Sequence, residues 1–207
     1  MREATAGSEA AAADPVTWPP DTRGRIMEAA VQQCEEFGLR RTTMDDVARR
    51  AGLSRATLYR HFESKDALVQ TVILVEAERF FARLDVALDG LQTSDERLVD
   101  GFAFALQYVR RHALLGKLLR TEPETLLPYL LGDSRLISIA TEAVAARIPG
   151  AAGAGSIDPQ DARSAAELIV RLVLSLALSP ESSLGLDDAE GARRLARRYL
   201  VPGLHLR

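Results

Sequence analysis

The chain has 207 residues, of which 47% are hydrophobic and 5% aromatic, a composition that excludes a disordered or fibrous protein and allows a sizeable core. The formal net charge is −3, but residues 22–65 hold nine Lys and Arg against six Asp and Glu, a net of +3, whereas the rest hold 17 against 23, a net of −6. An acidic body with one basic block excludes a general nucleic-acid coat and predicts that only this block meets phosphate.

Residues 1–20 are dominated by Ala, Pro and acidic residues and show no hydrophobic period. We expect a disordered arm here, without the apolar run that a signal peptide needs. An arm that enters the minor groove of DNA is the alternative. It is disfavoured because Arg2 is the only cation before Arg23.

Short helices with clear end signals are predicted at the start of the basic block. The first spans residues 22–37, with Asp21 as its N-cap and Gly38 as its stop. Thr43 is placed to cap a second helix, which Gly52 ends after about two turns.

A third helix is predicted from Ser54, its N-cap, to Phe62. Leu53 and Leu58 flank its start as a hydrophobic staple, and Leu58 and Phe62 stand four residues apart on the buried face. The second and third helices, with the turn at Gly52, have the helix-turn-helix pattern. The residues left on the outward face are Arg55, Ala56, Tyr59 and Arg60.

The remaining residues predict further helices and no strand, because no segment alternates with a period of two. A long helix runs from Ser64 to about Leu88. About nine or ten helices in an all-α fold are expected in total, with a loop at residues 150–155. Later helix starts are indicated by Thr93 with Glu96, Pro123, Asp133, Asp158 with Pro159, and Asp187 with Glu190.

The run from Thr42 to Leu68, TTMDDVARRAGLSRATLYRHFESKDAL, closely resembles the signature of the TetR/AcrR family of bacterial transcriptional regulators. The similarity covers about residues 22–70, and Ala56 departs mildly from the Gly that the family often has. The resemblance implies a helix-turn-helix DNA-binding domain at residues 21–67. It also implies a larger helical domain for ligand binding and dimerisation at residues 68–207.

The resemblance assigns DNA contacts to nine positions. Arg55 and Arg60 suit bidentate bonds to guanine, whereas Lys65 suits a phosphate. Tyr59 has a packed ring as its alternative, and His61 a purely structural role. The full set is Thr43, Ser54, Arg55, Ala56, Thr57, Tyr59, Arg60, His61 and Lys65.

The helix over residues 165–178 is apolar except for one stripe, Glu167, Arg171 and Ser175. Burial on two sides is therefore expected, by its own core and by a second copy of the chain, with a purely intramolecular core as the alternative. The last helix is expected to pair beside it, as in the dimers of this family. The predicted dimer contacts are Leu168, Ile169, Leu172, Val173, Leu176, Leu195 and Tyr199.

The resemblance places a ligand cavity among the middle helices, and few charges stand among the apolar residues there. A small-molecule effector that is largely apolar is expected, although residues of this kind are more often core residues than ligand contacts. The predicted ligand contacts are Phe80, Phe102, Tyr108, His112, Leu126 and Tyr129.

No catalytic residues, cofactor or metal ligands are expected, because the three histidines are far apart and no nucleophile, phosphate-loop or dinucleotide motif is present. The single cysteine, Cys34, excludes an intrachain disulfide, and no stretch suits a membrane. The expected protein is a cytoplasmic homodimer that binds operator DNA, a repressor released by its effector. The alternatives are an activator of the same fold and a ligand-binding bundle without specific DNA binding.

Overall fold

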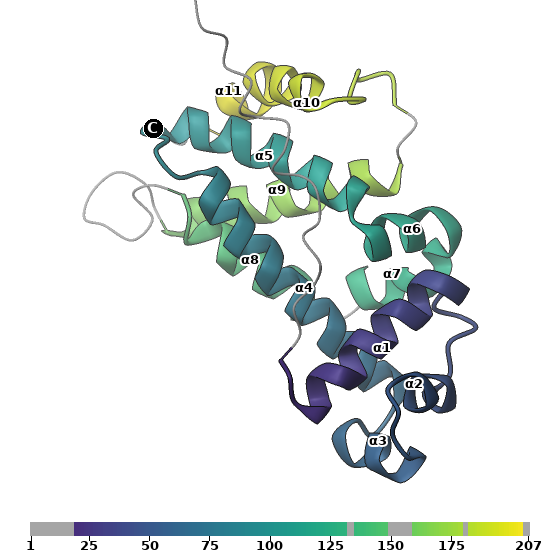
Figure 1. Ribbon diagram of the computed structural model, residues 1–207. Coiled ribbons are helices and arrows are strands. Elements are labelled where there is room, and N and C mark those ends of the chain that lie inside the picture. Colours follow the sequence, from purple (N-terminus) through teal and green to yellow (C-terminus); the bar gives the residue numbers. More distant parts are fainter. Residues whose placement is uncertain (1–18, 132–134, 149–158, 180–181, 205–207) are drawn as a thin grey trace, which may run out of the picture.

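The computed structural model describes residues 19–131, 135–148, 159–179 and 182–204 (Figure 1). Within these ranges the secondary structure is all helical, as predicted, and no strand is present. The last three elements form one continuous run, so the described ranges contain ten separate helical segments. The elements are α1 Thr22–Phe37, α2 Met44–Arg50, α3 Arg55–His61, α4 Lys65–Ala87, α5 Ser94–Arg111, α6 Ala113–Thr121, α7 Pro123–Leu131, α8 Arg135–Ala145, α9 Pro159–Leu178, α10 Ala189–Leu195, the π-helical η1 Ala196–Leu200 and α11 Val201–Leu204.

Most helices begin where the sequence predicts, because a side chain caps the free backbone N–H groups of the first turn. Thr93 and Glu96 form a complete capping box at the start of α5. The predicted arm, the caps at Asp133 and Asp158 and the loop at residues 150–155 lie outside the described residues. The confirmed N-caps are Asp21, Thr43, Ser54, Ser64 and Thr93.

The last helical run starts one residue later than predicted. Asp188, not Asp187, is its N-cap, and the Asp188 carboxylate accepts a hydrogen bond from the Gly191 N–H at 2.7 Å. Gly191 packs so closely on the Gly185 carbonyl that a Cβ on Gly191 would overlap it. This close approach between loop and helix sets the start, and the two adjacent aspartates give no local signal of it.

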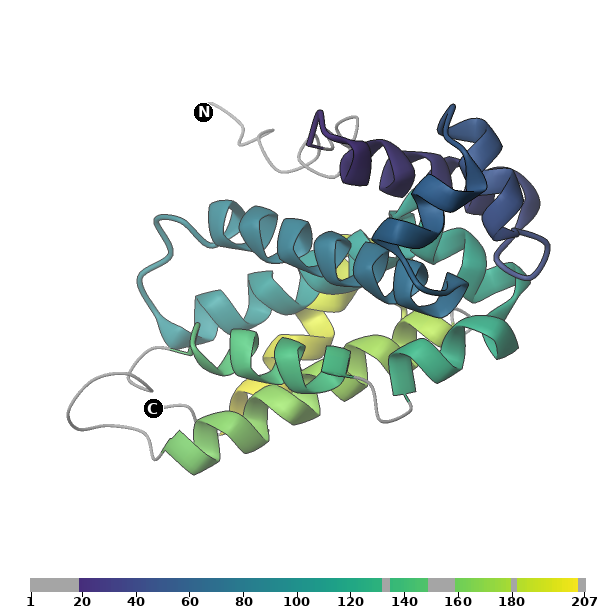
Figure 2. The ribbon, with the colours of Figure 1, turned by 90° about the horizontal axis from the view of Figure 1, so that it is seen from below.

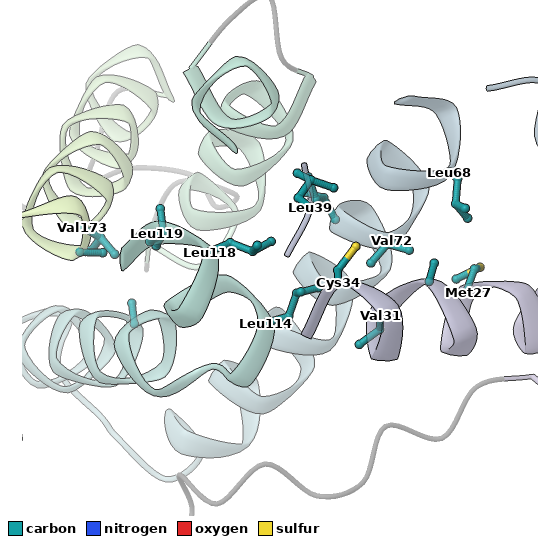
Figure 3. Packing of buried hydrophobic residues seen from close by; sticks show 14 of the residues in the cluster. Met27, Val31, Cys34, Leu39, Leu68, Val72, Leu114, Leu118, Leu119 and Val173 are labelled. Atoms are coloured by element: carbon teal, nitrogen blue, oxygen red, sulfur yellow. The ribbon is translucent and has the colours of Figure 1, made fainter. Parts of the chain in front are cut away.

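A continuous apolar core joins the N-terminal helices to the rest of the chain. Met27, Val31 and Cys34 on α1 pack against α4 and α6, as Figure 3 shows. Leu114 and Leu118 on α6 lie beside them, and the same core continues to α9. The N-terminal helices therefore share one core with the larger helical part.

The larger part is organised around α5. Helices α4, α6, α9 and α10 all pack on α5, and α8 packs chiefly on α9. Helix α4 runs from α3 along the whole length of this body (Figures 1 and 2). The last helical run lies mainly on α5 rather than beside α9 as expected. It buries Ala192 and Ala196 in the core, and Arg193 on α10 pairs with Asp100 on α5 at 2.7 Å. Among the described helices, none is long and apolar enough to cross a bilayer.

Candidate functional site

Helix α3 presents a polar, exposed face at one end of the molecule (Figure 1). Ser54 caps it, and the Ser54 and Thr57 hydroxyls lie 2.9 Å apart. Leu58 and Phe62 are buried, at 0% and 3% exposure, which confirms the predicted inner face. Thr57 and His61 are half-buried, and the exposed residues of α3 are Arg55, Ala56, Tyr59 and Arg60.

The two arginines of this face differ in their partners. Arg55 pairs with Asp45 of α2 at 3.2 Å and lies over the Tyr59 ring at 5.4 Å. Arg60 is exposed and has no carboxylate within 4 Å among the described residues. Arg60 is therefore the cation of α3 that is most available to an outside partner.

Two predicted phosphate contacts are already engaged within the chain. The Lys65 ammonium donates to the Leu39 carbonyl oxygen at 2.6 Å, and the Thr43 hydroxyl donates to Asp46 at 2.6 Å. That hydrogen bond, together with the nearby Arg49, lowers the pKa of Asp46. A lysine has three donors, so a phosphate contact by Lys65 would share rather than break its internal bond.

Arginines of α1 hold α3 in place. Arg23 stacks over the Phe62 ring at 4.6 Å, and Arg25 donates to the Ala51 carbonyl oxygen at 2.6 Å, just before the turn at Gly52. Gly52 has a φ of 65°, a conformation that favours glycine. The turn and the start of α3 are thus fixed from the α1 side.

A cavity of about 190 Å³ lies in the larger part of the chain, and its wall is almost entirely apolar. Helices α4, α5, α6, α8 and α9 all contribute to it. Its inner end, near α6, is lined by Ile73, Glu76 and Leu115, and its outer end, near the turn between α4 and α5, by Leu88, Ser94 and Arg147. The cavity therefore runs beside α4 away from the N-terminal helices.

Three of the six predicted ligand contacts line this cavity: Phe80, Phe102 and Tyr108. His112 instead caps α6, and Tyr129 donates from its hydroxyl to Asp66 at 2.5 Å, which raises the pKa of Tyr129 to about 12 together with burial. Neither lines the cavity, and the side chain of Leu126 lies outside the described residues. Whether any of them touches a ligand stays a prediction.

Sequence analysis missed a buried carboxylate at the inner end. Glu76 is 3% exposed and accepts hydrogen bonds from Arg79 at 2.6 Å and His112 at 2.9 Å. His112 Nδ1 accepts from the Leu115 N–H at 3.2 Å, so its proton lies on Nε2 and points to Glu76. Burial alone would raise the pKa of Glu76, but these hydrogen bonds outweigh it and hold the pKa below its ordinary value of 4.5.

Arginines at the outer end were also missed. Arg147 forms a bidentate pair with Asp85, at 2.6 and 2.7 Å, and lies over the Phe81 ring at 4.9 Å. This pair lowers the pKa of Asp85. Arg97 lines the cavity and donates to the Leu88 carbonyl oxygen at 3.1 Å. The only signal in the sequence was a set of isolated arginines, which are ordinarily surface residues.

The predicted dimer residues divide between the outside and the inside of the chain. Leu168 and Tyr199 are 60% and 57% exposed. Leu172 is half-buried, and Ile139 of α8, which the sequence did not single out, is 42% exposed. The remaining predicted contacts face the chain's own core or cavity: Ile169, Val173, Leu176 and Leu195.

Polar contacts between α6 and the end of α1 join the N-terminal helices to the cavity-bearing part. The Glu122 carboxylate, which follows α6, accepts from the Arg40 N–H at 2.8 Å. It lies directly against Gly38, where a Cβ would overlap it and where φ is 83°. Lys117 of α6 donates to the Glu35 carbonyl oxygen. We refer to the contact of Glu122 with residues 38–40 as the α6 latch.

Metal-binding geometry is not seen in the part of the chain that the structure describes, where no three His, Cys, Asp or Glu side chains gather as ligands. Cys34 is buried, and burial raises the pKa of its thiol. The two features that stand out are therefore the exposed face of α3 and the apolar cavity beside α4.

Known proteins share both the sequence of the N-terminal helices and the overall architecture. Residues 26–72 match the family model for bacterial regulatory proteins of the tetR family. The HTH-type transcriptional regulator Mb2274c of Mycobacterium bovis, itself uncharacterised, is 30% identical over 156 residues, covering 75% of this chain and 79% of the relative. The HTH-type transcriptional regulator UidR of Escherichia coli K12 is 28% identical over 185 residues, covering 88% and 92%.

A solved structure agrees with these relatives. The TetR family repressor AlkX from Dietzia sp. strain DQ12-45-1b, implicated in the biodegradation of n-alkanes, superimposes with a TM-score of 0.66 at 27% identity, covering 92% of this chain and all of that one. All three of these relatives are named as transcriptional regulators or repressors. The chain belongs to the TetR family and is a DNA-binding transcriptional regulator.

Proposed function

We propose that this regulator is a cytoplasmic repressor, active as a homodimer, that leaves its operator when a largely apolar small molecule fills the cavity. The observation that carries the proposal is that α4 lines the cavity along much of its length and also leads directly into α3. Residues 21–67 would act as the reading head and residues 68–207 as the effector domain. A ligand that moves α4 would move the head.

A second route between cavity and head supports the proposal. Ile73 and Leu115 line the cavity on one side and, on the other, a small apolar void of about 20 Å³. Val31, Cys34 and Leu39 form the head side of that void. A ligand that pushes on Ile73 or Leu115 would therefore displace side chains that pack on α1, because interiors are closely packed and transmit strain.

The relatives favour the repressor over the activator. AlkX, which is 27% identical to this chain, is named a repressor. The nine predicted contacts on and around α3 would read the operator, with Arg55 and Arg60 at base edges. Two such heads in a dimer would enter successive major grooves about 34 Å apart.

The α6 latch is expected to carry part of the ligand signal. Glu122→Ala removes the acceptor for the Arg40 N–H and should lower the free energy of unfolding by about 1 kcal/mol, the usual value of one hydrogen bond. The ratio of operator affinity without ligand to that with ligand should also decrease. The reason is that a movement of α6 would no longer be passed on through the Glu122 contact to the loop after α1. Urea unfolding and fluorescence anisotropy measure the two effects.

The matched control for the latch is Glu124→Ala, which removes an exposed carboxylate two residues further along. It should leave the ratio of operator affinities unchanged, although the loss of a carboxylate from the first turn of α7 can lower the free energy of unfolding as well. If the Glu122 variant and the native protein have the same affinity ratio, the α6 latch does not couple ligand binding to operator binding.

The exposed leucine of α9 is expected to lie in the dimer interface. Leu168→Glu places one carboxylate from each copy in that interface and should weaken the dimer at least about tenfold, because like charges brought together cost several kcal/mol. Sedimentation equilibrium measures the effect. Leu184→Glu, at another exposed leucine, is the control, and a native dimer constant in the Leu168 variant would place the interface elsewhere.

A purified transcription reaction tests the proposed function. An operator is first selected from random duplexes and then placed across a promoter. The proposal predicts less transcript when the protein is added and recovery of transcript when an aliphatic chain compound is added as well. More transcript on adding the protein would indicate an activator, and equal retention of all duplexes in the selection would indicate a ligand-binding bundle without specific DNA binding.

A further inference from the structure

The cavity is elongated along α5. Its lining on that helix extends from Ser94 to Val109, which is about 22 Å at a rise of 1.5 Å per residue. The lining is almost entirely apolar over this length. Length and lining together therefore favour a ligand with an extended aliphatic chain.

Charge is distributed unequally between the two ends. Of the residues that line the cavity, three are charged: Glu76 at the inner end, and Arg97 and Arg147 at the outer end. Glu76 is balanced by Arg79 at 2.6 Å, so the inner end offers no positive charge to an anion. At the outer end Arg147 is paired with Asp85, whereas Arg97 forms no ion pair with a described carboxylate.

Arg97 is the cation that lacks a carboxylate partner. Within the described part of the chain its guanidinium donates to a neutral carbonyl oxygen, that of Leu88 at 3.1 Å, and forms no ion pair with a carboxylate. A guanidinium has five donors, so most of those on Arg97 remain for a ligand. The planar fork of an arginine matches a carboxylate in particular.

The outer end also reaches solvent. The side chains of Arg147 and Asp85 are 23% and 54% exposed, and Asp85 is the carboxylate that pairs with Arg147. An incoming anion can take the place of Asp85 on Arg147, because Asp85 can turn out into water at little cost. Asp85 would thus be an exchangeable counter-ion of Arg147 at the entrance of the cavity.

From this shape and charge distribution we infer that the effector is a straight-chain amphiphile with one carboxylate head, its chain in the cavity and its head on Arg97 and Arg147 at the outer end. This inference rests on the proposed function for the role of the cavity. It adds the chemical class of the effector and its orientation, with the head group far from α6.

Calorimetry on the full chain, without DNA, tests the inference with three probes of equal chain length: decanoate, decan-1-ol and decylammonium. Decanoate should bind most tightly. Arg97→Gln should weaken decanoate binding roughly 10- to 100-fold, the value of a hydrogen bond to a charged group, and leave decan-1-ol unchanged. Asp85→Asn should instead tighten decanoate binding, a gain that a damaged fold would not produce.

Arg111→Gln, at an exposed arginine of α5 outside the cavity, is the matched control and should bind all three probes like the native protein. Equal binding of decanoate and decan-1-ol, no binding of any probe, or an Arg97 variant indistinguishable from the control would overturn the inference. If decanoate binds through Arg97 yet leaves operator affinity unchanged, the ligand class stands and the proposed function fails.

Discussion

Arg60→Ala is expected to weaken binding to the selected operator by about 2–6 kcal/mol per dimer, because about 1–3 kcal/mol of base contact is lost at each of two half-sites. Arg60 is exposed on α3 and free of carboxylate partners among the described residues, so the loss comes from DNA and not from the fold. Fluorescence anisotropy at about 0.15 M salt, with operator and random duplexes measured in parallel, gives the value.

Arg41→Ala is the control for this prediction. Arg41 is exposed in the loop before α2, where a cation attracts phosphate without reading a base. The control should weaken binding to operator and random duplexes alike, whereas Arg60→Ala should lower the ratio between them. An unchanged ratio in the Arg60 variant would remove this residue from the base-reading set.

Glu76→Leu is expected to lower the free energy of unfolding by about 3 kcal/mol, the usual cost of removing one partner from a buried ion pair. The substitution removes the buried acceptor that the Arg79 guanidinium and His112 Nε2 share. Urea unfolding at neutral pH measures the loss. Glu76→Gln keeps an acceptor of the same shape and should lower the free energy of unfolding by less. Comparing the two variants separates the contribution of the charge from that of packing.

The stability that Glu76 contributes should depend on pH in one direction. Its pKa in the folded chain lies below the ordinary value of 4.5, so the contribution is complete above pH 4.5 and is lost as the pH falls through the folded-state pKa. The difference between the native protein and Glu76→Leu should therefore shrink on acidification. A difference that stays constant from pH 7 to below the folded-state pKa would show that packing alone accounts for it.

The reading head was predictable because its signals are local. Asp21, Thr43 and Ser54 each cap a helix through a hydrogen bond that spans three residues, and Leu58 and Phe62 are four residues apart on one face. Such features are complete within a short window of sequence. The exception is Asp188, where the contact between Gly185 and Gly191 decides the start of the last helix.

The charged residues of the cavity were not predictable because tertiary packing brings them together. Arg147 meets Asp85 across 62 residues of chain, and His112 meets Glu76 across 36. His112, whose contact with a ligand stays a prediction, caps α6 from its position between α5 and α6. The aromatic residues Phe80, Phe102 and Tyr108 were found because large apolar side chains indicate an interior whether or not it is filled.

The proposed release from the operator depends on coupling between the cavity and the reading head. The decisive measurement is the equilibrium affinity of the native protein for its selected operator, with and without saturating decanoate, at about 0.15 M salt. We expect decanoate to reduce the affinity about 100-fold, which requires about 2.7 kcal/mol of differential binding. An operator affinity that does not change, while calorimetry shows the cavity to be filled, would contradict the account.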